Sequence, residues 1–147
     1  MKGSCVCGAI EFEVTEIPNM VFNCHCTRCR KSHGAAFATQ AFAIRDSLKF
    51  IRGEAESWRC RLTSRQTFQE EVLKEYESTG GIRTFCSHCG SRLMNYAKDN
   101  GDYLSIALSC IDTPHNLKPV AEVCISSKVD WHDLCDQLPH YDELPPI

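Results

Sequence analysis

The stretch CVCGAIEFEV, residues 5–14, joins a Cys-x-Cys-Gly motif directly to an alternating segment. Apolar residues alternate with Glu after the motif, as expected for a half-buried β-strand; they are Ile10, Phe12 and Val14. Because positions i and i+2 of an extended chain face the same way, the thiols of Cys5 and Cys7 can reach one ion. The stretch therefore predicts a strand with two metal ligands at its start.

Further short strands are predicted by runs of β-branched and aromatic residues between Gly, Pro, Asn and Asp turn signals. These runs are residues 20–22, 35–44, 48–51, 56–60, 92–97, 103–108 and 121–125. Long helices between them are missing from the pattern, so we expect one mainly β domain of short antiparallel strands over residues 1–147. Two segments depart from it: residues 63–79, rich in Gln, Glu and Lys, predict a helical insertion, and residues 131–138 predict a short helix.

Cysteine is the unusual component of the composition, with 11 residues among 147. The start of the chain does not resemble a signal peptide and no apolar run approaches the length of a membrane span, so we expect a cytoplasmic protein without a membrane partner. In that reducing compartment clustered Cys hold metal or do chemistry more often than they form disulfides. The net charge of −3 argues against a nucleic-acid partner. Oligomeric state leaves no signal in the sequence.

Seven of the cysteines fall in three groups. A second pair stands in FCSHCG, residues 85–90, with the Cys-x-x-Cys spacing and a closing Gly. The two flanking pairs together offer the four thiolates of a closed structural zinc site; they are Cys5, Cys7, Cys86 and Cys89. The four isolated cysteines are expected to be small core residues; they are Cys60, Cys110, Cys124 and Cys135.

The middle segment NCHCTRCRKSHG, residues 23–34, holds Cys24, Cys26 and Cys29 within six positions. If the flanking pairs satisfy one ion, this group has three ligands and no obvious fourth. Three protein ligands and an open position are typical of catalytic zinc. Spacing alone also allows Cys5 and Cys7 to share an ion with two of the middle thiols.

Basic and imidazole side chains accompany the middle cysteines. The basic ones are Arg28, Arg30 and Lys31; they would attract the carboxylates of an anionic thiol, or else are solvated charges at a turn. His33 is placed to exchange a proton at the open position, or else is an exposed loop residue. His25 and His88 lie within Cys motifs, and we expect supporting or surface roles for them rather than metal contact.

The order of these motifs resembles the glutathione-dependent formaldehyde-activating enzyme family, also called the centromere protein V-like family. The matching stretches are GSCVCGA (residues 3–9), CHCTRCRKSHGAAF (24–37), FCSHCG (85–90), SKVDW (127–131) and DQLPHYDELP (136–145). The resemblance implies an Mss4-like fold, or β-tent. It also implies the same division of the cysteines, with a structural zinc on the flanking pairs and a catalytic zinc on Cys24, Cys26 and Cys29.

The activity attributed to the family implies a carbon-sulfur lyase that forms S-hydroxymethylglutathione from formaldehyde and glutathione, or reverses that step. Two departures stand out. The stretch between residues 53 and 85 is longer than is usual in the family, and Glu122 stands where the family commonly has His. We therefore consider three functions: the lyase-like enzyme, a non-enzymatic zinc-stabilised module that binds a protein, and a metal-free thiol redox sensor.

Overall fold

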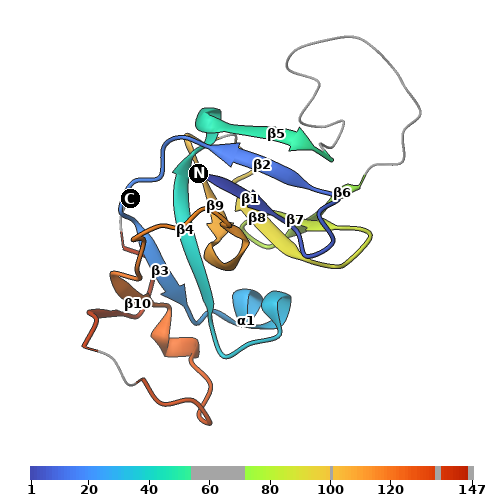
Figure 1. Cartoon of the computed structure of the whole chain (residues 1–147). Helices are drawn as coiled ribbons and strands as arrows, with labels where there is room; N and C mark the ends of the chain where they lie inside the picture. The colour runs from blue at the N-terminus through green and yellow to red at the C-terminus, as the bar shows by residue number, and fades with distance from the viewer. Residues whose placement is uncertain (54–71, 100, 135–136, 146–147) are drawn as a thin grey trace.

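The computed structural model describes residues 1–53, 72–99, 101–134 and 137–145 (Figure 1). These residues form two β-sheets, one helix of two turns and three short 3₁₀ turns. The elements are β1 (Lys2–Ser4), β2 (Glu11–Val14), β3 (Val21–Cys24), α1 (Thr27–His33), β4 (Ala38–Ile44), η1 (Arg45–Ser47), β5 (Leu48–Arg52), β6 (Leu73–Ser78), β7 (Gly81–Cys86), β8 (Arg92–Tyr96), β9 (Tyr103–Ala107), η2 (Leu108–Cys110), β10 (Ala121–Val123), η3 (Ile125–Ser127) and β11 (His140–Tyr141).

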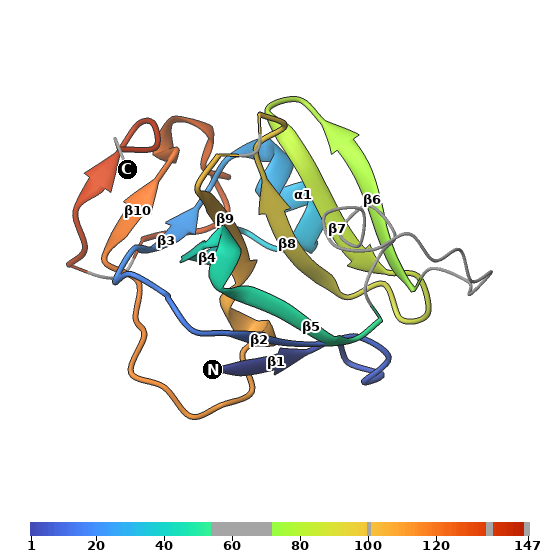
Figure 2. The same cartoon turned by 90° about the horizontal axis from the view of Figure 1, so that it is seen from above.

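The smaller sheet has the strand order β1-β2-β5, and the larger one the order β11-β10-β3-β4-β9-β8-β7-β6. Figure 2 shows the larger sheet running from β10 on the left to β6 on the right, with β1, β2 and β5 lying across one side of it and α1 on the other. Most pairs are antiparallel, but β10 is parallel to both β3 and β11. The prediction of a mainly β fold of short antiparallel strands is confirmed, with parallel pairing at this one edge of the larger sheet.

The main core lies between the two sheets. Ile10, Phe12 and Val14 are fully buried there, as their alternation predicts. They pack in one cluster with Leu104 and Ile106 of β9 and with further apolar residues of β4, β7 and β8. Burying a side chain of this size contributes about 1.5–3 kcal/mol, so the face that the alternating segment presents fixes the register of β2.

The predicted helical insertion is wrong where the structure describes it, because Leu73–Ser78 is strand β6, paired antiparallel with β7. Thr79 and Gly80 connect the two strands as a tight turn, and Gly80 has a φ of 91° that favours glycine. All six residues of β6 pair with β7, and the rings of Tyr76 and Phe85 lie side by side across the pair, so this pairing overrides the helix propensity of the Glu and Lys residues. The rest of the predicted insertion, and the predicted strand at residues 56–60, lie outside the described residues.

The predicted C-terminal helix is also wrong for residues 131–134 and 137–138, which form turns and irregular backbone.

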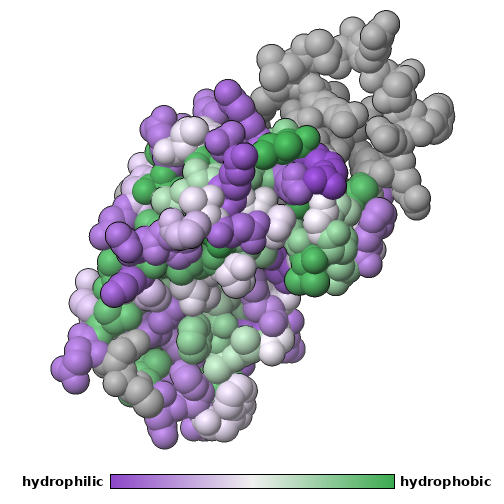
Figure 3. Space-filling view, viewed as in Figure 1, coloured by the Kyte–Doolittle hydropathy of each residue, from purple (hydrophilic) through white to green (hydrophobic). Residues whose placement is uncertain are grey.

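Hydrophobic residues are interspersed with hydrophilic ones over the face drawn in Figure 3. None of the helices in the described ranges has the length and apolar character needed to cross a membrane.

Candidate metal centres

The two flanking Cys pairs meet in one place. The sulfur atoms of Cys5, Cys7, Cys86 and Cys89, the four-Cys group, all lie within 4.8 Å of one another. Cys7 Sγ is 3.5 Å from Cys5 Sγ and 3.8 Å from Cys86 Sγ. A tetrahedral zinc with Zn–S bonds of about 2.3 Å requires sulfur–sulfur distances of about 3.8 Å. The group therefore fits a closed tetrahedral metal site.

Two glycine turns and one serine hold this group together. Gly8 and Gly90 follow the pairs with φ angles of 72° and 76°, a backbone conformation that L side chains rarely adopt. Ser91 Oγ accepts the N–H of Val6 at 3.0 Å and lies 3.2 Å from Cys89 Sγ, so it joins the two halves of the group. The Ser91 hydroxyl, by hydrogen bonding to the sulfur, lowers the pKa of Cys89 to about 5, which favours the thiolate that a metal requires.

The middle cysteines form a second cluster, the three-Cys group, with the sulfurs of Cys24, Cys26 and Cys29 within 4.8 Å of one another. Cys24 ends β3, Cys26 caps α1 and Cys29 is buried in the helix. Cys26 Sγ accepts the N–H of Cys29 at 3.3 Å. Hydrogen bonds from the Cys24 and Cys29 thiols hold the pKa of Cys26 well below its ordinary range. The three sulfurs thus converge as one set that could hold a metal ion and offer it three ligands.

A buried arginine that sequence reasoning missed touches this group. Nη2 of Arg83, from β7, lies 3.7 Å from Cys29 Sγ, and Nη1 donates to Ser32 Oγ and to Asn95 Oδ1. Arg83 is 8% exposed. It also lines a cavity of about 400 Å³ formed by the β6–β7 turn, β8, β9 and Arg28. An arginine in a strand carries no signal in the sequence that it contacts a cysteine 54 positions away.

The predicted basic residues take different places. Arg28 is exposed, donates to the carbonyl of Thr79 and lines the cavity. Arg30 instead donates from Nε to the carbonyl of His25 and braces the loop that carries the cysteines. Lys31 is exposed, and it is not among the residues that line the cavity.

His33 reaches the three-Cys group only indirectly. Its Nε2 accepts from Gln40, whose side-chain oxygen accepts from Asn95, and Asn95 in turn contacts Arg83. Burial, with the charges of Arg92 and Arg83, lowers the pKa of His33 to about 4. At neutral pH this imidazole is uncharged, so it accepts a hydrogen bond rather than acting as a charged proton donor.

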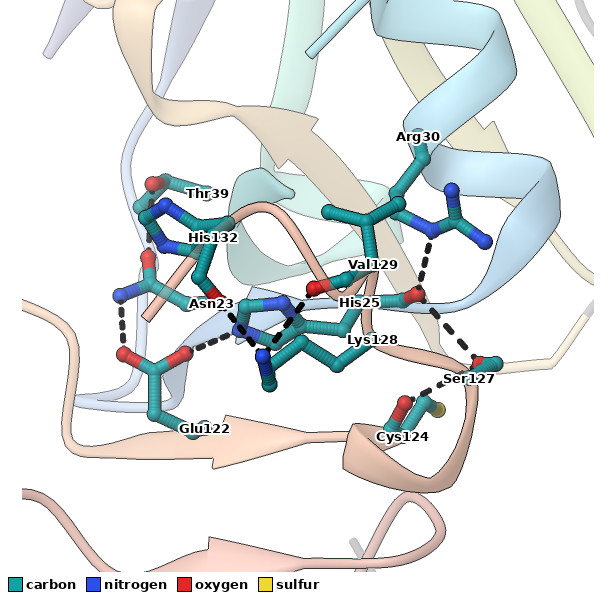
Figure 4. Close-up of polar contacts among 10 residues, drawn as sticks. All are labelled: Asn23, His25, Arg30, Thr39, Glu122, Cys124, Ser127, Lys128, Val129 and His132. Atoms are coloured by element: carbon teal, nitrogen blue, oxygen red, sulfur yellow. Dashed lines mark hydrogen bonds and ion pairs between the residues drawn. The ribbon is translucent and has the colours of Figure 1, made fainter. Parts of the chain in front are cut away.

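His25 is fully buried and takes part in a polar network with Glu122 (Figure 4). Its Nε2 lies 2.5 Å from Glu122 Oε2. The other carboxylate oxygen accepts from Asn23 Nδ2 at 2.8 Å, and Asn23 accepts from Thr39. His25 is outside both cysteine groups, which is the supporting position expected for it; His88 is exposed within the Cys86–Cys89 turn and is also outside them.

The isolated cysteines are less buried than predicted. Cys110 is half-buried and donates to the carbonyl of Arg92. Cys124 is half-buried and has a left-handed φ of 58°. It packs against the smaller apolar cluster of Phe22, Ala121 and Val123, and it also borders the three-Cys group, because Val123 pairs with Cys24 in the β10–β3 register. Cys60 and Cys135 lie outside the described residues.

Known proteins share this chain's sequence pattern and fold. The family model of the glutathione-dependent formaldehyde-activating enzymes matches residues 1–127. A Halomonas elongata protein described as a candidate enzyme of that name is 28% identical over 137 residues, covering 91% of this chain and 80% of that protein. A crystal structure of a Rhodobacter sphaeroides protein superposes with a TM-score of 0.57 and 24% identity over 79% of this chain and 92% of that one, which shows the shared fold. The chain belongs to the glutathione-dependent formaldehyde-activating enzyme family.

Proposed function

We propose that the protein is a zinc-dependent carbon-sulfur lyase that joins formaldehyde to glutathione, giving S-hydroxymethylglutathione, and reverses the reaction. The formaldehyde carbon gains a bond to the glutathione sulfur, the thiol proton is lost and the aldehyde oxygen gains a proton, so the addition needs no redox partner. Zinc at the three-Cys group would supply Lewis acidity, which lowers the pKa of a bound thiol or polarises the aldehyde oxygen. Membership of the family supports the substrate pair.

The observation that carries the proposal is the three-Cys group itself. Three sulfurs converge within 4.8 Å, which leaves one corner of a tetrahedron for a substrate atom. Arg83, next to Cys29, supplies a positive charge that would favour the thiolate form of an incoming thiol. The buried Cys29 and the cap made by Cys26 fix two of the ligands in place before substrate arrives.

The four-Cys group would hold a second zinc with a structural role. Its four sulfurs would complete a tetrahedron around a zinc ion, which would leave no position for substrate. The group connects the β1–β2 turn to the end of β7, which joins the smaller sheet to the larger one.

The test compares the parent protein with Cys26→Ser and with Cys110→Ser as a control from outside both groups. Metal analysis should give two zinc per chain for the parent and the control, and one for Cys26→Ser. Exchange NMR on formaldehyde and glutathione should show faster adduct formation with the parent and the control, and only the spontaneous rate with Cys26→Ser. Two bound zinc without acceleration would instead favour a zinc-stabilised binding module. A folded, reduced protein with no zinc would favour the redox sensor.

A further inference from the structure

We propose that the cavity beside the three-Cys group binds the zwitterionic α-amino-acid end of the thiol substrate, with Arg83 and Arg28 on its carboxylate and Asp99 and Asp102 on its ammonium group. This inference rests on the proposed function, because it takes the substrate to be a thiol held at the three-Cys group. For glutathione it assigns the γ-glutamyl end to the cavity and leaves the glycyl end outside.

The first observation concerns the burial of Arg83 and the partners of its side chain. The residue is 8% exposed, and among the described residues its hydrogen-bond partners are Ser32, Ser78, Asn95 and the Cys29 thiol, none of which is a carboxylate. A buried cation is costly unless opposite charge accompanies it. A Cys29 thiolate would offset part of this charge, and a carboxylate that entered beside Arg83 would stabilise the cation further. Arg83 lines the cavity, so an anionic group that enters there could pair with its guanidinium, and Arg–carboxylate pairs are among the strongest hydrogen bonds in proteins.

The charges around the cavity give the second observation. Arg28 and Arg83 line it together with Asp99 and Asp102. A ligand with a carboxylate alone would meet two carboxylates of the protein, whereas a ligand that also carries an ammonium group finds a partner for each charge. The mixed lining therefore favours a zwitterion over a simple anion such as the glycyl end of glutathione.

Position and size agree with such a ligand. Arg83 lines the cavity, and its Nη2 is 3.7 Å from Cys29 Sγ, so one residue borders both the cavity and the three-Cys group. An extended tripeptide spans at most about 10 Å, and a volume of about 400 Å³ is within the range of small-ligand pockets. A thiol with its sulfur at the three-Cys group can therefore place its amino-acid end in the cavity. Contact between Arg28 and the carbonyl of Thr79 links the helix to the turn that forms the opposite wall.

The test measures binding without turnover. S-methylglutathione, whose blocked sulfur cannot react, is titrated calorimetrically into the zinc-loaded parent, Arg83→Gln, Arg28→Gln and the control Arg52→Gln, which makes the same charge change on the smaller sheet. We expect affinity about 30-fold weaker for Arg83→Gln, several-fold weaker for Arg28→Gln and unchanged for Arg52→Gln. Removing the α-amino group of the ligand should weaken binding to the parent, and esterifying the glycyl carboxylate should not.

Arg28→Gln keeps the test decisive if Arg83→Gln does not fold, because the Arg28 side chain is exposed. Equal affinity of the parent and the cavity variants, no binding to the parent, or loss of affinity only on glycyl esterification would overturn the assignment. The readout separates it from the proposed function. Binding that follows the expected pattern without any catalysis would refute the lyase and leave the cavity assignment intact. Catalysis without that binding pattern would support the lyase and overturn the cavity assignment.

Discussion

Replacing Glu122 should destabilise the protein strongly although the residue lies outside both cysteine groups. Glu122 is 2% exposed, and its carboxylate partners are His25, which is fully buried, and Asn23, which is 6% exposed. In Glu122→Ala both side chains lose their partner in a region that water does not reach. Breaking a buried pair of this kind costs about 3–5 kcal/mol. That is a large part of the ~5–15 kcal/mol by which a typical domain is stable.

Two further variants separate the hydrogen bonds from the general effect of losing a charge. Glu122→Gln keeps the shape and can still accept from Asn23, so we expect a loss of only about 1–2 kcal/mol. Glu13→Ala removes an exposed carboxylate on β2 and should change stability by less than about 0.5 kcal/mol.

The assay is equilibrium urea unfolding of the zinc-loaded proteins, followed by far-UV circular dichroism, with zinc content measured on each sample. The order of loss in free energy of unfolding should be Glu122→Ala, then Glu122→Gln, then Glu13→Ala. The reasoning is refuted if Glu122→Ala keeps its zinc and unfolds within about 1 kcal/mol of the parent. In that case the His25–Glu122 contact would contribute no more than a surface pair.

Two other predictions concern the four-Cys group and His33. Cys86→Ser should lose one zinc per chain and at least about 3 kcal/mol of stability, because metal binding at a closed site contributes folding free energy. The control Cys110→Ser should keep both zinc ions and lose less than about 1.5 kcal/mol. Equal stability of the two variants in urea would contradict the structural site. The ring of His33 should titrate by NMR near pH 4 rather than at its ordinary 6.5. Between these values the unfolded chain binds a proton that the folded chain excludes, so the contribution of His33 to stability falls as pH drops from about 6.5 to 4. A titration midpoint of the His33 ring at or above about pH 6 would show that burial does not lower its pKa.

Local patterns predicted the parts of the molecule that depend on neighbours in sequence. The alternation of Ile10, Phe12 and Val14 identified β2 because a strand with one buried face needs that period. The spacing of the cysteines and their glycines identified both clusters, since a turn brings nearby thiols together wherever it occurs. Spacing left the partition of the ligands open, and the structure brings the cysteines together in the arrangement of four and three that the resemblance implies.

Long-range contacts account for what sequence reasoning missed. Residues 73–78 have the composition of a helix, and only their pairing with β7 makes them a strand. Glu122 departs from the family pattern, and its role follows from its contact with His25, which lies 97 positions earlier in the chain. Cys124 borders the three-Cys group because β10 runs parallel to β3, and no local signal indicates a parallel pair between segments so far apart.

The four-Cys group also bears on how the long stretch before β7 is tolerated. Cys7 and Cys86 are 79 positions apart, so a metal shared by them would close a large loop of chain. The entropy lost on closing a loop grows only with the logarithm of its length. Adding the 18 residues of the segment 54–71 to such a loop would raise the closure cost by about 0.2 kcal/mol, far less than a shared metal ion contributes. A chain whose two Cys pairs share a metal ion can therefore gain or lose residues between those pairs at little cost in folding free energy.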